Sequence, residues 1–165
     1  MKILLISDTH IPISTNNIPK KILEEASNCN LCLHAGDLID YKVFLTLSQI
    51  VKTEAVCGNM DNWEVKEKLP PKKIIEVEAI KIGLIHGSGH PQKLISFVNN
   101  SFVQEFDFID LFVFGHSHCA LDETINGKIY FNPGSPTDKI FAPYNSYGII
   151  SIENNKIERR LIRIE

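Results

Sequence analysis

Short, largely apolar runs separated by polar loops set the pattern of the first third of this chain. Residues 2–6, 31–34 and 55–57 are each short, mostly apolar and followed directly by polar residues, which is typical of buried strands. Between these runs, Pro19 is suited to a first helical turn and Asp40 to the cap of a second helix. The alternation of strand and helix predicts parallel strands joined by right-handed crossovers.

Apolar side chains recur at helical spacing in the two segments between these strands. Such recurrence places them on one face of a helix, which packs against a sheet. The two predicted stripes are Ile22, Leu23 and Ala26, and Val43, Phe44, Leu47 and Ile50.

In the second part of the chain the strands are expected in adjacent pairs. Residues 74–77 and 80–85 are separated by a two-residue turn. Asn126-Gly127, between residues 123–125 and 128–130, is a strong signal for a type I′ hairpin turn.

The remaining elements complete an α/β layout. A helix is predicted from Pro91, with Leu94, Ile95 and Val98 facing inward, and a buried strand at residues 111–114. Residues 147–152 and 156–164 are predicted strands joined across Asn154-Asn155, and the second strand is expected to have one solvent-exposed face. The layout predicts two packed sheets with helices outside.

The composition is that of one ordinary globular domain, which we expect to span residues 1–165. The 165 residues are 44% hydrophobic and 22% charged, enough to bury a core. A net charge of −3 without a basic stripe argues against a dedicated nucleic-acid surface. The first apolar run is too short for a signal sequence or a membrane span, so we expect a cytoplasmic protein with no membrane partner.

The four cysteines are not spaced like a zinc knuckle. Cys29 and Cys32 form a lone C-x-x-C, and Cys57 and Cys119 lie too far apart to provide a second pair. We therefore expect buried free thiols, with Cys57 and Cys119 as small core residues.

Side chains with metal-binding chemistry follow five of the predicted strands. Ligands of open α/β sheets bind beyond the carboxyl ends of the strands, so these side chains are expected to meet at one edge. Carboxylate, imidazole and amide groups together suit divalent manganese, iron or zinc. The candidates are Asp8 and His10, Asp37, Asn59 and Asp61, His86, and His116 and His118.

Taken singly, several of these residues have plainer interpretations. Asp8 alone is better explained as the cap of a turn, and His86 alone as a hydrogen-bonded residue at a strand end. His34 points to the same edge but lies within an apolar strand, so a structural or supporting role ranks ahead of direct ligation. The joint occurrence at five strand ends is what favours a metal site. Glycines at 36, 58 and 115 allow sharp turns and close approach there.

The ordered motifs resemble the calcineurin-like metallophosphoesterase superfamily. The short length and the Asn132-Pro133-Gly134-Ser135 run are similar to its small single-domain bacterial and archaeal phosphodiesterase branch. The motifs that carry the resemblance are Asp8-Thr9-His10, Gly36-Asp37, Gly58-Asn59-Met60-Asp61, His86-Gly87 and Gly115-His116-Ser117-His118.

The resemblance implies a four-layer α/β sandwich of two mixed sheets flanked by helices, and a binuclear phosphodiesterase. In such a site a hydroxide that bridges two divalent ions attacks phosphorus in line with the leaving group. Manganese is the expected metal, with iron, zinc, nickel and cobalt as alternatives. The implied ligands are Asp8, His10 and His118 for one ion, Asn59, His86 and His116 for the other, and Asp37 as the bridge.

Two residues are expected to be catalytic. Asn59 would contact both metal and phosphate, and Asp61 would orient a ligand through a hydrogen bond. The alternative for Asp61 is a surface aspartate in a turn. Many members of the superfamily have a histidine where this chain has Met60, so the general acid is unidentified and good leaving groups should be preferred.

Two further positions leave alternatives open. Ser88 replaces a second histidine that is common in the branch, and His90 either substitutes for it or is a plain loop residue. Trp63 either walls the pocket or packs elsewhere.

The expected partner is a small phosphoester substrate, and relatives of this fold favour a homodimer. The main rival function is a scaffold that acts through protein contacts, because the small subunit of the retromer coat resembles this fold with a degraded metal site. A nuclease similar to the DNA-repair phosphoesterases is disfavoured, since those carry extra domains and the histidine that Met60 replaces.

Overall fold

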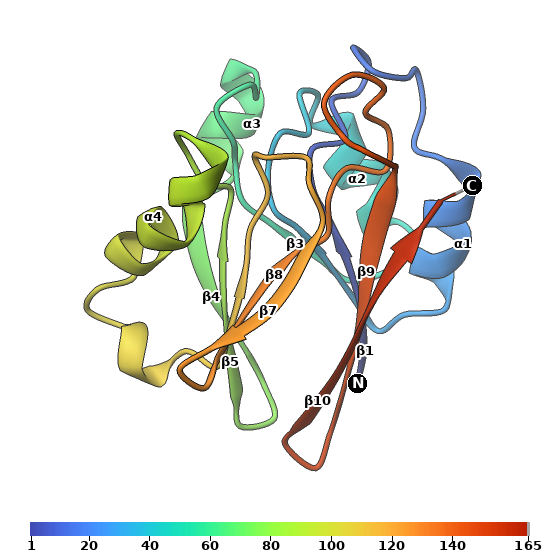
Figure 1. Cartoon of the computed structure of the whole chain (residues 1–165). Coiled ribbons are helices and arrows are strands. Elements are labelled where there is room, and N and C mark those ends of the chain that lie inside the picture. The colour runs from blue at the N-terminus through green and yellow to red at the C-terminus, as the bar shows by residue number, and fades with distance from the viewer. Residues whose placement is uncertain (165) are drawn as a thin grey trace.

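Two mixed five-stranded sheets pack face to face in the computed structural model, which describes residues 1–164 (Figure 1). The first sheet has the order β10 (Lys156–Arg163), β9 (Ser146–Glu153), β1 (Lys2–Ile6), β2 (Leu31–His34) and β3 (Thr53–Ala55). The second has the order β4 (Lys72–Val77), β5 (Ile80–Ile85), β6 (Leu111–Val113), β8 (Lys128–Asn132) and β7 (Leu121–Ile125).

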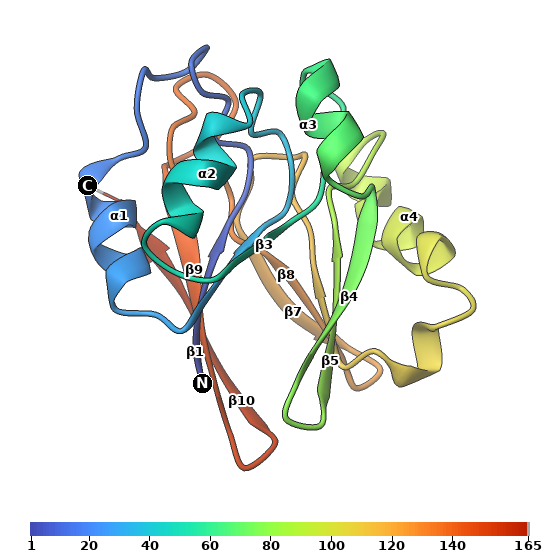
Figure 2. The same cartoon turned by 180° about the vertical axis from the view of Figure 1, so that it is seen from behind.

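Helices cover the outer faces of both sheets (Figures 1 and 2). The first sheet is covered by α1 (Lys20–Ser27) and α2 (Lys42–Ser48), and the second by α4 (Leu94–Ser101). A short helix α3 (Trp63–Lys68) lies in the connection between the sheets, and two 3₁₀ turns, η1 (Pro91–Lys93) and η2 (Phe106–Phe108), flank α4. The predicted four-layer α/β sandwich is therefore confirmed.

Alternation along the strands divides the apolar side chains among three cores. Ile3 and Leu5 of β1 face the space between the sheets, whereas Leu4 and Ile6 pack with the side chains of α1 and α2. A third core lies between the second sheet and α4, and Phe112 of β6 belongs to it. Because successive side chains of a strand point to opposite faces, a sheet covered on both sides needs such nearly continuous apolar runs.

Parallel register brings the carboxyl ends of the central strands to one level. In the first sheet Ile6 lies beside His34, and His34 lies beside Ala55. In the second sheet Val113 pairs with Phe131 of the parallel strand β8. All these strand ends lie at the upper end of the molecule in Figure 1, opposite the three hairpin turns.

The predicted hairpins are confirmed, including their turns. Asn126 and Gly127 have φ values of 50° and 80°, as a type I′ turn requires. Asn154 and Asn155, which join β9 to β10, have φ values of 51° and 60°. The helix predicted from Pro91 begins as the 3₁₀ turn η1 and buries Leu94 and Val98 in α4.

Three details of the predicted elements were wrong. The third strand is Thr53–Ala55 rather than residues 55–57, because the parallel register with β2 ends it earlier and Cys57 instead bonds the carbonyl of Pro70. Helix α2 ends at Ser48, so Ile50 lies beyond it and is exposed. Helix α3 was not predicted, because Val65 is its one buried residue and forms no apolar stripe.

The cysteines are free thiols, as expected, but their burial is uneven. Cys32 is fully buried, Cys57 is intermediate and Cys119 is exposed, so the placing of Cys119 in the core was wrong. Within residues 1–164 the longest helices, α1 and α4, have eight residues each, and none has the length and apolarity of a membrane span.

Candidate metal centre

The loops after β1, β2, β3, β5 and β6 bring most of the predicted ligands into one cluster. A first group, Asp8, His10 and His118, offers ligand atoms that all lie within 4.8 Å of one another. The Asp8 Oδ1 atom is 3.3 Å from Nε2 of His118 and 3.9 Å from Nε2 of His10. One carboxylate and two imidazoles are thus arranged around a single point.

A second group comprises Asp8, Asp37 and His86, with the same spacing of ligand atoms. Nε2 of His86 is 3.2 Å from Oδ2 of Asp37 and 3.8 Å from Oδ1 of Asp8. Oδ2 of Asp37 also lies 3.3 Å from Nε2 of His10, which belongs to the first group. Each carboxylate is therefore close to histidines of both groups: Asp8 and Asp37 both lie near His10 and His86. The bridging role of Asp37 stays a prediction.

Two buried ring nitrogens face these carboxylates without a hydrogen-bond partner: Nε2 of His10 and Nε2 of His86. The other nitrogen of His86, Nδ1, lies 2.7 Å from the carbonyl oxygen of Ala35. Because a carbonyl only accepts, Nδ1 must carry a proton, so Nε2 is the nitrogen that faces the carboxylates and is placed to bind a metal. A buried polar atom without a partner is destabilising, so the donor set fits a bound divalent cation that would satisfy these nitrogens.

The electrostatics of the cluster also favour positive charge. Burial acts to raise the pKa of Asp8, but the imidazoles of His10, His118 and His86 around it hold it far below its usual value. Burial likewise acts to lower the pKa of His10 and of His86, yet Asp37 and Asp8 raise both to about 9. The buried carboxylates thus stay ionised and draw cationic character to this point.

His118 is held by a residue that the sequence analysis missed. Its Nδ1 donates a 2.6 Å hydrogen bond to Oδ2 of Asp138, which leaves Nε2 directed at Asp8. Asp138 also accepts hydrogen bonds from the backbone amides of residues 140, 141 and 142. The Pro136-Thr137-Asp138 sequence after the Asn132–Ser135 run is a turn signal, but no spacing rule links it to His118.

Asn59 and His116 lie at the mouth of the cluster rather than in either group. Nδ1 of His116 is 3.1 Å from Oδ1 of Asn59, and its Nε2 is 3.0 Å from the carbonyl oxygen of Gly89. Both ring nitrogens are therefore engaged, so one contact must be given up before His116 binds a metal. The ring of His116 stands edge-on to that of His86, with centroids 5.4 Å apart.

Asp61 is buried beneath the cluster, which excludes the alternative of a surface aspartate. Its carboxylate accepts hydrogen bonds from the backbone amides of Asp37 at 3.1 Å, Ile39 at 2.6 Å and Gly58 at 2.7 Å. These contacts are those of a residue that fixes the loops carrying Asp37 and Asn59. They place no oxygen of Asp61 in the cavity described below.

The backbone of the site is unusual. Asp8, His10, Asp37, His116 and His118 all have φ values between 45° and 72°. This left-handed conformation is costly for a residue with a side chain, by about 1 kcal/mol or more each, and clusters at functional sites. Hydrogen bonds from distant segments hold it: the Asp8 amide bonds the Gly36 carbonyl, and the His116 amide bonds the Asp8 carboxylate.

Glycine is required at two close approaches in this cluster. Gly36 has a φ of 93°, and a Cβ there would lie 2.7 Å from Nδ1 of His86. A Cβ on Gly115 would collide with the Ser7 hydroxyl and the Asp8 carboxylate. The expected crowding of the backbone around the site is therefore present.

The remaining sequence candidates lie outside the cluster. His34 accepts from the Gly36 amide at Nδ1 and bonds Thr9 at Nε2, and burial lowers its pKa to about 3, so it is a neutral structural residue. His90 is exposed and caps η1 through Gln92, which matches the plain loop interpretation. Trp63 is exposed at the start of α3.

A cavity of about 560 Å³ opens over the cluster. Its walls include side chains from both metal-binding groups and from the mouth: His10, Asp37, Asn59, His116 and His118. Met60 lies in the same wall, and its amide donates a 2.8 Å hydrogen bond to Asp37. A volume of this size suits a small-molecule ligand.

Comparison with known proteins gives consistent matches. Residues 1–155 match the model of the calcineurin-like phosphoesterase superfamily domain. The chain is 35% identical over 170 residues to a probable metallophosphoesterase from Methanocaldococcus jannaschii, an alignment that covers 100% of this chain and 82% of that protein.

Two solved structures extend the comparison. The solution NMR structure of a Thermotoga maritima protein superposes with a TM-score of 0.77 at 29% identity and covers 99% of both chains. The crystal structure of Vps29 from Entamoeba histolytica, complexed with zinc, has a TM-score of 0.75 at 21% identity and again covers 99% of both chains. At that identity the second likeness describes the fold alone.

Proposed function

Because the chain belongs to the calcineurin-like phosphoesterase superfamily, we propose that it is a metal-dependent phosphoesterase that hydrolyses phosphodiesters. The observation that carries the proposal is the pair of buried Nε2 atoms, of His10 and His86, that face two ionised carboxylates without a partner. Imidazole nitrogens and carboxylate oxygens that converge in this way are the donor atoms that a bound divalent cation takes.

We propose two divalent ions, with manganese as the preferred metal. Asp8, His10 and His118 would hold one ion, Asn59, His86 and His116 the other, and Asp37 would contact both. When bound, such ions supply positive charge against the phosphate oxygens and lower the pKa of a water molecule. The mixed carboxylate, imidazole and amide chemistry of these residues supports a borderline-to-hard divalent ion.

The protein's own groups would orient the substrate at the cavity mouth. Asn59 offers an amide that can donate a hydrogen bond to a phosphate oxygen, and its present partner, His116, can be exchanged for that contact. Asp138 fixes the ring of His118, and Asp61 fixes the Asp37 loop. Met60 carries no proton, so the leaving oxygen receives none from that position, and esters of acidic alcohols are expected to react fastest.

The rival proposal is a scaffold that acts only through protein contacts. The likeness to Vps29 supports neither function, since it describes the fold alone. The enzyme is favoured because the carboxylates and imidazoles of the cluster are all present and line a cavity that can admit a substrate.

Hydrolysis of bis(p-nitrophenyl) phosphate tests the proposal. Metal-stripped protein should be inactive, and added manganese should restore release of nitrophenolate. The Asp37→Asn variant should lose that activity, because it removes one buried negative charge between the two sets of histidines.

A matched control is Asp110→Asn, which alters a carboxylate that bonds the Lys81 amide at the opposite end of the sheet. This variant should keep full activity. Absence of hydrolysis by the wild-type protein with manganese, iron, zinc, nickel and cobalt would contradict the enzyme and favour the scaffold.

A further inference from the structure

Four large apolar side chains at the cavity over the metal cluster are exposed to solvent. They are Ile13, Met60, Ile140 and Phe141, with exposed fractions of 68%, 52%, 81% and 72%. We call these four residues the apolar rim. Exposed apolar side chains that are scattered singly need no explanation, but a group that lines one cavity marks a ligand or interaction site.

The segment that carries half of the rim is fixed to the metal cluster. Asp138 bonds the amides of Ile140 at 2.9 Å and Phe141 at 3.0 Å, and the same carboxylate accepts the hydrogen bond from His118. The ring of Phe141 stands edge-on to that of His118, with centroids 5.8 Å apart. The two apolar side chains are therefore held beside the cluster by specific contacts rather than left on a free loop.

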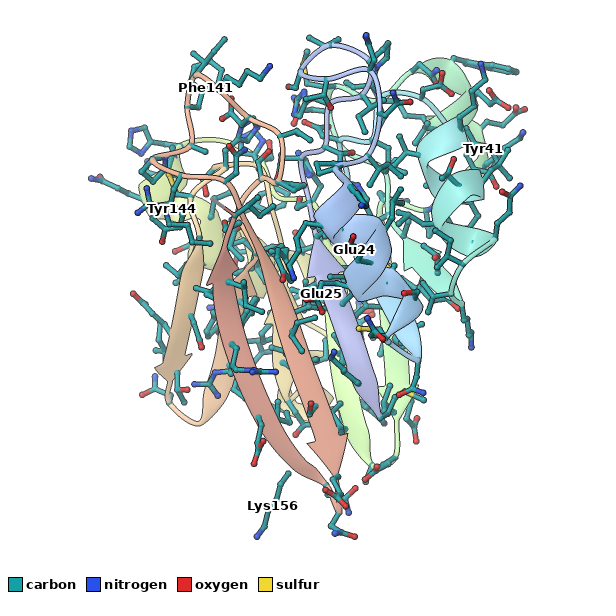
Figure 3. All side chains as sticks on the ribbon, turned by 90° about the vertical axis from the view of Figure 1, so that its right-hand side faces the viewer. Glu24, Glu25, Tyr41, Phe141, Tyr144 and Lys156 are labelled. Atoms are coloured by element: carbon teal, nitrogen blue, oxygen red, sulfur yellow. The ribbon has the colours of Figure 1, made fainter. Side chains whose placement is uncertain are left out.

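Figure 3 shows where this segment lies. Phe141 projects at the tip of the loop between β8 and β9, at the opposite end of the molecule from Lys156 in the β9–β10 hairpin. The carboxyl ends of β1 and β3 also lie opposite the β9–β10 hairpin (Figure 1), and all four rim residues line the cavity over the cluster.

The charges of the cavity restrict what enters it. Among the described residues that line it, none is a lysine or an arginine, and the two acidic side chains are Asp37 and Asp138. Within the lining, positive charge comes from the histidines and from metal bound at the cluster, while Lys66 bonds the Asn59 carbonyl at the mouth. A substrate with one phosphate is therefore matched, whereas a second phosphate or carboxylate placed against the four apolar side chains would meet no Lys or Arg of the lining.

We propose that the substrate is a phosphoester with one phosphate group and an uncharged, apolar aryl or alkyl group, which lies against Ile13, Met60, Ile140 and Phe141. This proposal rests on the proposed function, since the phosphate of the same molecule would be held at the metal cluster. Polyphosphates and highly charged organic groups are excluded by the same chemistry. Burial of the organic group against the rim supplies binding energy in proportion to the apolar area covered.

Equilibrium binding of non-hydrolysable probes to the manganese-loaded protein tests the proposal without reliance on turnover. Phenylphosphonate should bind about tenfold more tightly than methylphosphonate, as expected for a ring partly removed from water. 4-Carboxyphenylphosphonate should lose most of that advantage, because its added charge would face the rim.

The combined Ile140→Ser and Phe141→Ser variant should bind phenylphosphonate and methylphosphonate equally and should keep its manganese affinity. Both substitutions retain the backbone amides that bond Asp138. The matched control is Phe108→Ser in η2, which removes an aromatic side chain of similar exposure, 67%, outside the cavity lining. This control should preserve the tenfold preference.

Equal binding of the two phosphonates by the wild-type protein would overturn the role of the rim and leave the phosphoester site intact. An unchanged preference in the Ile140→Ser and Phe141→Ser variant would overturn it in the same way. Failure of both phosphonates to bind the manganese-loaded protein would instead overturn the proposed function, and the substrate inference with it.

Discussion

The two ends of the sandwich both depend on left-handed backbone, but they support it in different ways. At the hairpin end, the lower end in Figure 1, the residues with positive φ are mostly asparagine and glycine. Asn126 and Gly127 turn β7 into β8, and Asn154 and Asn155 turn β9 into β10. These residue types adopt the conformation at little cost, so each turn is satisfied by its own local sequence.

At the opposite end the left-handed residues include Asp8, His10, Asp37, His116 and His118, which form the metal cluster and its mouth. No hairpin turn places these Asp and His residues in the left-handed conformation. Hydrogen bonds from distant segments maintain it instead. The Asp8 carbonyl accepts from Ser135, and the His10 amide bonds the Asp37 carbonyl. The comparison indicates that the hairpin end is shaped by local sequence, whereas the cluster is shaped by the assembled fold and is strained where it carries chemistry.

The largest expected difference between the two ends is the effect on manganese affinity of removing one carboxylate charge. Asp8→Asn should lower manganese affinity at least about 100-fold, because Asp8 belongs to both groups of candidate ligands. This loss exceeds the one typical of a residue that only hydrogen-bonds a metal ligand. Asp110→Asn, which changes a carboxylate at the hairpin end, should leave that affinity unchanged. Isothermal titration of both variants measures the difference, and an equal effect would remove the distinction between the ends.

Glycine replacement gives the next largest effect. Gly115→Ala should destabilise the protein by about 2–3 kcal/mol, because its Cβ would collide with Ser7 and Asp8 in a packed region. Gly127→Ala, with φ of 80° and no atom within 4 Å of the added carbon, should cost only about 1 kcal/mol of left-handed strain. Denaturant unfolding of both variants checks the order, and the reverse order would contradict the account.

A smaller effect is expected at the residue that supports His118. Asp138→Asn should weaken manganese binding about tenfold, since the charged partner of the His118 ring is lost while an acceptor oxygen remains. The free energy of unfolding of the metal-free protein should change less than the metal affinity does. A variant that loses stability but binds manganese normally would show that Asp138 only organises its own loop.

The smallest effect belongs to the hairpin turns themselves. Asn126→Gly should change the free energy of unfolding by no more than about 0.5 kcal/mol, because glycine adopts the φ of 50° at this position equally well. Thermal or chemical unfolding measures it. A loss above about 2 kcal/mol would mean that the turn depends on more than its local backbone.

The sequence predicted the fold best where local patterns carry the information. The ends of the first two strands, the parallel first third and the Asn126-Gly127 hairpin follow from period and turn chemistry. The pattern also predicted two packed sheets with helices outside, and the resemblance identified this as a four-layer sandwich. Helix α3 escaped because six residues with one buried side chain give no periodic stripe, although Asn62 caps it and Glu64 and Lys68 follow the helix dipole.

The candidate site was predicted less completely, for a physical reason. Residues such as Asp37 and His86 could be named because strand ends converge on one edge. Asp138 could not, because its bond to His118 spans 20 residues and depends on how the loop before β9 folds back. The apolar rim was missed for the same cause, since Ile140 and Phe141 look like ordinary loop residues until the cavity is assembled.

The metal centre is tested most simply by the number of manganese ions that the metal-free protein binds, counted by electron paramagnetic resonance during titration. Two ions per chain are expected for the wild-type protein, loss of tight binding in Asp8→Asn, and two ions again in Asp110→Asn. No stoichiometric binding of manganese or of another divalent transition metal would contradict the central claim that the edge beyond β1, β2, β3, β5 and β6 is a metal centre.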